Sequence, residues 1–244
     1  MKLLGYTLTP DYPQFPVKEK TIVNTINPHS YCVAKSDLEF KEALRQSDFL
    51  LPDGVGIVLA AKVLKGKKIE KIAGYDVFIH LMQQLNEKGG TSFFLGAAPE
   101  TLEKIKERSA RDFPNVKVHT YSPPDNTIFS GEESQQMWEA VNAVQPDALF
   151  VGMTAPKQEK WVHQYIEHLN ANIICSIGAV FDFYAGTVKR PSQFWIKLGL
   201  EWLPRFLKEP RRLAERNLVS TPKFVWEVLR ERVKLGRTKY EVRS

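Results

Sequence analysis

The sequence has few cysteines, no long apolar run and no Asp-x-Asp motif, and each absence excludes a class of protein. Its two cysteines, Cys32 and Cys175, lie in the apolar runs SYCVA and NIICSIG, which indicates buried free thiols in a reducing compartment. No apolar stretch reaches the length of a membrane-spanning helix, and no basic-then-apolar leader opens the chain. We therefore expect a cytoplasmic protein without a transmembrane segment.

What is present is the composition of a folded protein with an uneven charge. The 244 residues are 43% hydrophobic and 25% charged, enough for a core in one large α/β domain or two packed subdomains. Residues 186–244 hold 15 Lys and Arg against six Glu, whereas residues 1–185 hold 19 basic and 22 acidic residues. This basic C-terminal end predicts an anionic partner: lipid, diphosphate or nucleic acid.

Short apolar runs of strand length alternate with longer amphipathic runs up to about residue 190. We expect strands at 21–27, 48–53, 91–97, 116–122, 147–153 and 172–181, and helices at 36–45, 54–64, 74–90, 99–113, 130–144 and 156–169. Ser36 with Glu39, and Ser130 with Glu133, form capping boxes at two of the helix starts. Strands joined by helices at this spacing predict an α/β fold with a Rossmann-like, mostly parallel sheet flanked by helices.

After Lys189 the strand signal stops and the chain reads as a helical appendage, broken into short pieces by three prolines, Pro204, Pro210 and Pro222. We therefore divide the chain into an α/β core at 1–190, with approximate subdomains 1–90 and 91–190, and an appendage at 191–244.

The appendage interleaves Lys and Arg with large aromatic residues, which is typical of helices that lie in a membrane interface. The aromatic residues are Phe194, Trp195, Trp202, Phe206, Phe224 and Trp226. An ordinary helical subdomain with a solvated basic face is the alternative. Nucleic-acid binding is disfavoured, because no recognition helix, zinc site or RNA-binding strand accompanies the charge. The aromatic face would need cover, from an anionic membrane surface or from a homo-oligomer.

Four segments place polar or small residues at predicted strand ends, where open parallel sheets bind ligands. They are NTINPHS with Thr25, Asn27 and His29, LLPDG with Asp53, FLGAAPE with a turn of small residues, and VGMTAPKQEKW with Lys157 and Gln158 at the start of a helix. Asp53 stands between two apolar runs, and a carboxylate there is costly unless it serves a turn or a function. Gly96 opens a turn into a helix N-terminus, whose free N–H groups suit a diphosphate.

Each segment also has an ordinary structural explanation. Asp53 could cap the next helix, Asn27 could be a turn residue, and Gln158 could be a solvated helix-start residue. The turn at Gly96 lacks the full Gly-x-Gly-x-x-Gly pattern, so a dinucleotide cofactor is weakly supported. Four strand ends with such residues on one sheet nevertheless favour a ligand-binding site.

Seven motifs, in order over nearly the whole chain, carry a resemblance to a known family. They are NPHS, LLPDGVGIV, AGYD, FFLGA, APKQEKW, GAVFDFYAGTVKRP and GLEWLPRFLKEPRR. With them the sequence resembles the WecG/TagA/CpsF glycosyltransferases, family 26, which include N-acetylmannosaminyltransferases of wall teichoic acid and enterobacterial common antigen synthesis. The resemblance implies inverting transfer of a sugar from a UDP-sugar to a polyprenyl-diphosphate-linked sugar, by a peripheral protein on the inner face of the cell membrane.

The resemblance also implies roles for individual residues, with Asp53 as the general base. The donor site would comprise Thr25, Asn27, Gly54, Lys71, Asp76, Gly96, Ala97, Gly152 and Gln158, and the acceptor diphosphate would meet Lys189, Arg190, Arg205, Arg211 and Arg212. This chain departs from the family pattern twice: Lys71 replaces an arginine, and Glu215 replaces a third arginine of the appendage. Arg216 is adjacent, but one residue turns a helix by about 100°, so adjacency alone does not give Arg216 that role.

The missing Asp-x-Asp motif leads us to expect a metal-independent enzyme without cofactor, in which helix N-termini and basic side chains stabilise the leaving diphosphate. Two other classes stay open. A nucleotide-sugar-modifying enzyme such as an epimerase would need a redox cofactor or a second acid–base residue. A non-catalytic module for anionic lipid or nucleic acid would bind without regard to UDP or Asp53. N-acetylmannosamine is the sugar most commonly expected to be moved in the family.

Overall fold

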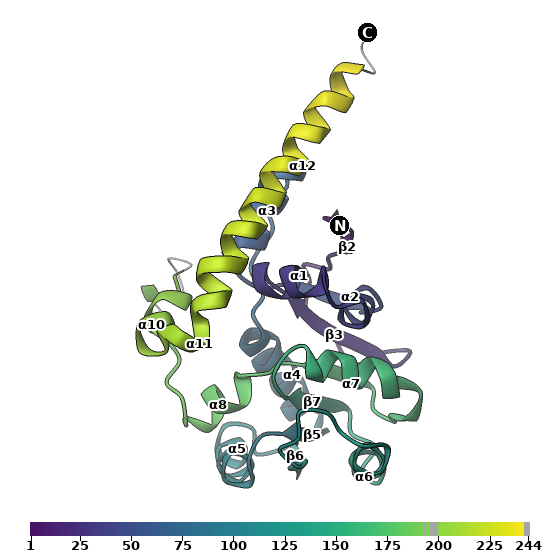
Figure 1. The fold of residues 1–244 in the computed structure, drawn as a ribbon. Coiled ribbons are helices and arrows are strands. Elements are labelled where there is room, and N and C mark those ends of the chain that lie inside the picture. Colours follow the sequence, from purple (N-terminus) through teal and green to yellow (C-terminus); the bar gives the residue numbers. More distant parts are fainter. Residues whose placement is uncertain (193, 196–199, 242–244) are drawn as a thin grey trace.

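The computed structural model of the chain describes residues 1–192, 194–195 and 200–241, with the side chains at 205, 208, 212 and 237–241 left undescribed. Its centre is a six-stranded sheet in the order β4-β3-β8-β7-β5-β6, in which every neighbouring pair is parallel (Figure 1). The strands are β3 (Thr21–Ile26), β4 (Phe49–Pro52), β5 (Thr91–Gly96), β6 (Lys117–Tyr121), β7 (Ala148–Gly152) and β8 (Ile173–Ser176). The predicted α/β class and parallel sheet are confirmed.

Helices connect these strands and then continue into the appendage. They are α1 (Pro28–Ala34), α2 (Leu38–Arg45), α3 (Val55–Lys65), α4 (Gly74–Lys88), α5 (Pro99–Asp112), α6 (Gly131–Asn142), α7 (Lys157–Tyr165), α8 (Val180–Ala185), α10 (Trp202–Lys208), α11 (Pro210–Ala214) and α12 (Thr221–Glu241). A π-helical segment, Glu215–Ser220, joins α11 to α12, and a 3₁₀ turn, Ile166–His168, follows α7. A small antiparallel pair, β1 (Lys2–Leu3) and β2 (Tyr6–Thr7), precedes the sheet and was not predicted.

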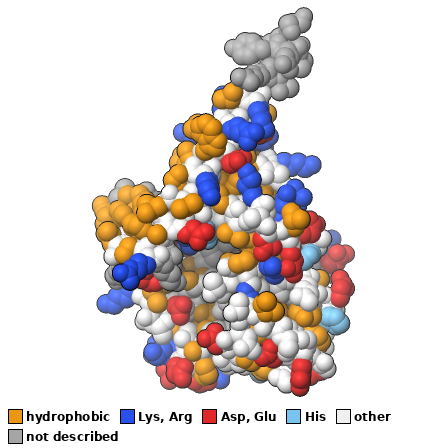
Figure 2. Space-filling view, in the orientation of Figure 1, with side chains coloured by type: hydrophobic (Ala, Val, Ile, Leu, Met, Phe, Trp, Pro, Cys, Tyr) orange, Lys and Arg blue, Asp and Glu red, His pale blue; other side chains and the backbone are white. Residues whose placement is uncertain are grey.

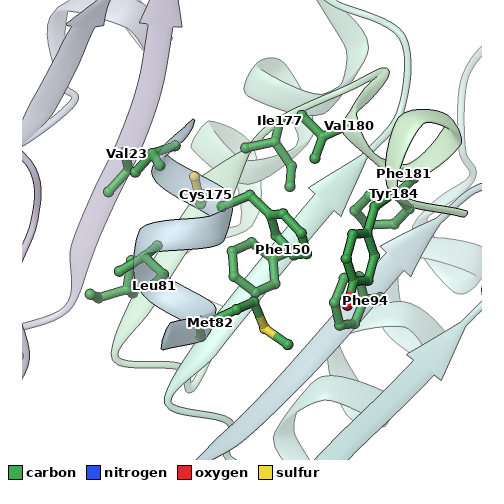
Figure 3. Close-up of a cluster of buried hydrophobic side chains, with 14 of the residues drawn as sticks. Val23, Leu81, Met82, Phe94, Phe150, Cys175, Ile177, Val180, Phe181 and Tyr184 are labelled. Atoms are coloured by element: carbon green, nitrogen blue, oxygen red, sulfur yellow. The ribbon is translucent and has the colours of Figure 1, made fainter. Parts of the chain in front are cut away.

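Helices cover both faces of the sheet, so the strands carry apolar side chains on both faces. Phe94 and Phe150 project to one face of the sheet (Figure 3). On that face the ring centroid of Phe78 in α4 lies 6.0 Å from that of Phe94 and 5.1 Å from that of Phe150. Leu95 and Val151, one residue further along each strand, project to the opposite face and pack under α6 and α7. This alternation fixes the register and brings the strand ends to one level.

A third apolar cluster lies at the β3–β4 edge, and the appendage contributes to it. Phe224 of α12 is 1% exposed, and its ring centroid lies 5.2 Å from that of Tyr31 in α1. The prediction that Phe224 lies at a membrane interface was wrong, because α12 packs against α1 and α3 beside Gly56. Beyond this contact α12 projects from the body of the molecule towards the C-terminus (Figure 1).

Three local predictions were also wrong. Asp37, not Ser36, caps α2, because the carboxylate of Asp37 accepts the Phe40 N–H while the Ser36 hydroxyl donates back to the Val33 carbonyl. The apolar run 172–181 is a strand only to Ser176 and then turns into α8. Pro222 does not break the appendage, because it occupies the first turn of α12, where no intrahelical N–H bond is required.

Gly152 gives a test of this packing. A Cβ atom at Gly152 would lie 2.5 Å from the Phe181 ring, whereas a Cβ at Gly131 of α6 would meet nothing within 4 Å. We expect Gly152→Ala to lower the free energy of unfolding by about 1–3 kcal/mol through overpacking, and Gly131→Ala to leave it nearly unchanged. Urea denaturation followed by circular dichroism measures both, and equal midpoints for the two variants would contradict the packing described.

Candidate active site

The carboxyl ends of the strands bring the predicted site residues to one edge of the sheet. Asp53 follows β4, Asn27 follows β3, and Gly96 of β5 stands level with Gly152 of β7. The strand order reverses between β3 and β8 and again between β5 and β7, and such reversals leave a crevice between the loops. Four inter-strand steps separate β4 from β5, about 19 Å in all. The candidate residues therefore form a row that suits an extended ligand.

Asp53 does not serve the turn chemistry that could have explained it. Gly54, with φ of 90°, is the N-cap of α3, and no side chain caps that helix. The Asp53 N–H donates to the Ile26 carbonyl at 2.9 Å, which fixes the backbone beside β3. The half-buried carboxylate does not cap α3, and the capping explanation is wrong.

Burial raises the pKa of Asp53 above its ordinary value. The positive charges of Arg216 and Lys71 act in the opposite sense, as does a hydrogen bond with Asn27, whereas Glu201 adds to the rise in the pKa. Burial is the largest influence, so Asp53 is a stronger base than a solvated aspartate. The neighbouring cations keep its ionised form accessible.

Asn27 both caps a helix and contacts Asp53. Its Oδ1 accepts the backbone N–H groups of His29 and Ser30, both at 3.0 Å, and caps α1. Because Oδ1 is occupied by the cap, the amide nitrogen Nδ2 is the donor available to the Asp53 carboxylate. Thr25, two residues earlier on β3, is half-buried on the strand face that also carries Val23.

An ion-pair chain links candidates from both halves of the predicted site. Glu201 contacts Lys71 at 3.1 Å and Arg190 at 3.3 Å, and Arg190 contacts Asp76 at 3.3 Å. Arg190 also lies over the Tyr75 ring, 4.3 Å from its centroid. The prediction missed Glu201, although it lies within the GLEW motif. Its position means that Lys71, Asp76 and Arg190 are held together by an acidic residue of the appendage.

The π-helical segment places Arg216 at the site. The Thr221 N–H donates to the Arg216 carbonyl, five residues back, and the Ser220 hydroxyl lies 2.9 Å from Nδ1 of His29. Burial and then the Arg216 charge lower the pKa of His29, and the same charge opposes the raised pKa of Asp53, so Arg216 lies near both. Arg216 is half-buried whereas the adjacent Glu215 is exposed, and the charge of Arg216 acts on both Asp53 and His29.

Gly96 and Gly152 have a structural reason to lack side chains. A Cβ at Gly96 would overlap the Gly152 carbonyl, and a Cβ at Gly152 would overlap Phe181. Ala97 follows in a left-handed conformation, with φ of 61°, and the Ser122 hydroxyl donates to its carbonyl at 2.8 Å. Close packing of the strand ends therefore forms the turn that leads into α5.

Gln158 is a buried bridge between two loops and not a solvated residue. It is 3% exposed, and its Oε1 accepts the N–H groups of Met153 at 3.1 Å and Gly178 at 3.0 Å. Its Nε2 donates to Glu159 at 2.8 Å, and burial raises the pKa of Glu159 to about 7. Gln158 therefore fixes the loops after β7 and β8 relative to each other.

Several helices begin at this edge without a side-chain cap. These are α3, α5, α7 and α8, whereas side chains cap α1, α2 and α6. Uncapped N-termini present free N–H groups and the positive end of the helix dipole. An anionic group that lies along the row of strand ends would be favoured by them.

The remaining candidate residues lie in or before the appendage. Lys189 and Arg211 are exposed, and the side chains of Arg205 and Arg212 fall outside the described residues. Two surface pockets of about 330 and 550 Å³ lie along residues 10–16 and include none of the predicted site residues. Among the described side chains, no group of three or more His, Cys, Asp or Glu could hold a metal ion.

Comparison with known proteins finds relatives over most of the chain. A family model described as Glycosyl transferase WecG/TagA/CpsF family matches residues 14–238. The chain is 34% identical over 207 residues to the N-acetylglucosaminyldiphosphoundecaprenol N-acetyl-beta-D-mannosaminyltransferase of Bacillus spizizenii, covering 84% of this chain and 77% of that protein. Proteins of the same name from Bacillus subtilis and Staphylococcus aureus are 30% and 26% identical, over 86% and 88% of this chain and 79% and 82% of their own.

Replacing Arg216 tests whether its charge acts on Asp53. We expect Arg216→Gln to raise the pKa of Asp53 further, because the cation that favours the carboxylate is removed, and Arg216→Lys to leave it closer to the original. The measurement is a carboxyl ¹³C NMR titration with Asp53 assigned. Arg230→Gln, on the exposed surface of α12, is the matched loss of charge and should leave the pKa of Asp53 unchanged. An Asp53 titration that does not respond to Arg216→Gln would contradict the arrangement.

Proposed function

Because this chain belongs to the WecG/TagA/CpsF glycosyltransferase family, we propose that it transfers N-acetylmannosamine or a related hexose from a UDP-sugar to a polyprenyl-diphosphate-linked sugar. The proposal assigns it to glycosyltransferase family 26, in bacterial cell-surface polysaccharide synthesis such as that of teichoic acid. The names of its relatives give the acceptor as N-acetylglucosaminyl-diphosphoundecaprenol and the transferred sugar as N-acetylmannosamine. Family membership favours neither an epimerase nor a non-catalytic module.

The observation that carries the proposal is the half-buried carboxylate of Asp53, which caps no helix. In an inverting transfer the acceptor hydroxyl attacks the anomeric carbon, its proton passes to the Asp53 carboxylate, and the bond to UDP breaks on the opposite face. One base is enough for this displacement, provided that it lies within hydrogen-bond reach of the hydroxyl. Asn27 orients the carboxylate, and burial strengthens it as a base.

The leaving UDP develops negative charge on its diphosphate, and donors must meet that charge. We assign this role to the uncapped N-termini of α5 and α7, together with the basic charge of Lys71. Thr25 and the turns at Gly96, Ala97 and Gly152 would line the donor, and Gln158 would hold the loops around it. Gly54, with φ of 90°, allows the turn between Asp53 and α3.

The acceptor is proposed to approach from the appendage. Its diphosphate would meet Lys189, Arg190, Arg205, Arg211 and Arg212, and Arg216 is added to that set. Exposed aromatic residues, Phe194, Trp202 and Trp226, would hold the appendage at an anionic membrane surface on the inner side of the cell. No helix within the described ranges combines the length and hydrophobicity needed to cross a bilayer.

The Asp53→Asn variant tests the role of Asp53 in catalysis and its effect on stability separately. We expect the kcat of the variant to fall by about 10²–10⁴-fold, because the base is removed. Calorimetry should still detect binding of the UDP-sugar to the variant. Asp53 has a folded-state pKa above its unfolded value, so its ionisation costs stability as pH rises through that pKa. The variant should therefore also unfold at a higher temperature than the parent protein at pH 7.5. Retained transfer activity would rule out Asp53 as the base.

The metal requirement is tested separately. We expect transfer to persist after dialysis against EDTA, since the proposed stabilisation of UDP uses N–H groups and basic side chains. The assay is mass spectrometry of products from UDP-N-acetylmannosamine and a short-chain prenyl-diphosphate-N-acetylglucosamine. Activity that disappears with EDTA and returns with Mn²⁺ would overturn metal independence and leave the role of Asp53 to be tested on its own.

A further inference from the structure

A stripe of apolar side chains is exposed on α3, which belongs to the catalytic core and not to the appendage. Val55, Leu59 and Val63 recur at every fourth residue and are 37%, 54% and 40% exposed. This spacing places them on one side of the helix, over a length of about 12 Å. Three apolar side chains in line on one helix form a patch, in contrast to apolar residues scattered singly over a surface.

The neighbouring helix α12 has a matching stripe. Val225, Leu229 and Val233 also recur at every fourth residue, and Leu229 and Val233 are 53% and 56% exposed. Hydrophobic side chains follow one side of α12, and basic side chains follow the other (Figure 2). The exposed surface of α12 is thus itself divided into an apolar side and a basic side.

The two stripes lie next to each other. A Cβ built at Gly56 would lie 3.7 Å from the Phe224 ring, so the side of α3 that carries Gly56 faces α12. On the opposite side of α12, Glu227 pairs with Lys35 at the end of α1, at 2.6 Å. By helical periodicity, Val225 and Leu229 lie away from that ion pair, on the side of α3. We call the six residues Val55, Leu59, Val63, Val225, Leu229 and Val233 the apolar ridge.

Basic residues flank the apolar ridge on both helices. All are exposed: Lys62, Lys65, Lys67 and Lys68 on and after α3, and Lys223, Arg230, Arg232 and Lys234 on α12. An apolar strip bordered by cations matches an anionic lipid surface, with acyl chains for the strip and phosphates for the cations. Pairing of the ridge with a second copy of the chain would bring these like charges together, which opposes association.

We propose that α3 is a membrane-docking element of the catalytic core, which inserts the apolar ridge into an anionic lipid surface together with α12. This rests on the proposed function, which assigns membrane contact to the appendage alone. Val55 is two residues from Asp53, so docking of α3 fixes the height of the carboxylate above the lipid. A polyprenyl-linked acceptor presents its diphosphate at that surface, and the docked helix holds the base in reach of its sugar.

The test uses the full chain with Leu59→Gln and Val63→Gln together. Sedimentation with vesicles of phosphatidylcholine and phosphatidylglycerol should show at least about a tenfold loss of protein bound to the vesicles. The reason is that two apolar side chains that would be buried in the lipid are lost. Leu38→Gln with Ile128→Gln removes two exposed apolar residues outside the ridge and should leave partitioning unchanged. Replacing Lys65, Lys67 and Lys68 with Gln should weaken binding by about fivefold for each lysine, only on vesicles that contain phosphatidylglycerol.

A second readout separates docking from catalysis. The Leu59→Gln, Val63→Gln protein should transfer sugar normally to a water-soluble short-chain acceptor and poorly to a long-chain acceptor in vesicles. If the parent protein fails with the soluble acceptor, the proposed function fails, and the vesicle measurement still decides docking. Unchanged partitioning of the ridge variant, or an equal loss in the control pair, would overturn the proposal. So would a concentration-dependent dimer that the ridge variant abolishes, since a second copy would then occupy the ridge.

Discussion

The carboxyl group of Asp53, whose pKa is raised by burial, is the constraint on which the arrangement depends. A carboxylate at the end of an edge strand, half removed from water, is tolerated only if other groups stabilise its charge. Those groups come from distant parts of the chain: Asn27 from the end of β3, Lys71 from the segment before α4, and Arg216 from the π-helical segment. The environment of Asp53 is therefore complete only when the appendage has packed onto the core.

The appendage accordingly takes part in the site and is more than a flexible extension. Glu201 lies between Lys71 and Arg190, Ser220 contacts His29, and Phe224 fills a space beside α1. The Glu201 pairs are mostly screened from water, with side chains 17–19% exposed, so desolvation offsets much of their attraction. Their main effect is to set the position of the chain that leads into the basic helices. Part of the C-terminal excess of positive charge thus serves the site itself.

The sheet and its functional edge could be predicted from sequence, because apolar runs of strand length end at Asp53 and Gly152 and the intervening helices carry clear periodicity. The rest depends on tertiary contacts. Nothing local distinguishes Phe224, which is core, from Trp226, which is exposed, because the choice depends on where α3 lies. Glu201 carries no local signal, because its role depends on pairing with Arg190 and with Lys71, which is 130 residues away in sequence. A single π turn also leaves no pattern in the residues around it.

The two departures from the family pattern affect different parts of the reaction. The electrostatic support of Asp53 depends on how many cations lie near it and how far away they are, so Lys71 can provide it as an arginine would. Bidentate hydrogen bonding to a diphosphate requires instead a planar guanidinium group, which Arg216 has and Lys71 lacks. Lys71 is already paired to Glu201, whereas Arg216 lies in the π-helical segment of the appendage. Under the proposed mechanism, the replacement at Lys71 leaves the role of Asp53 unchanged, and the selection of donor and acceptor is where this chain should differ from its relatives.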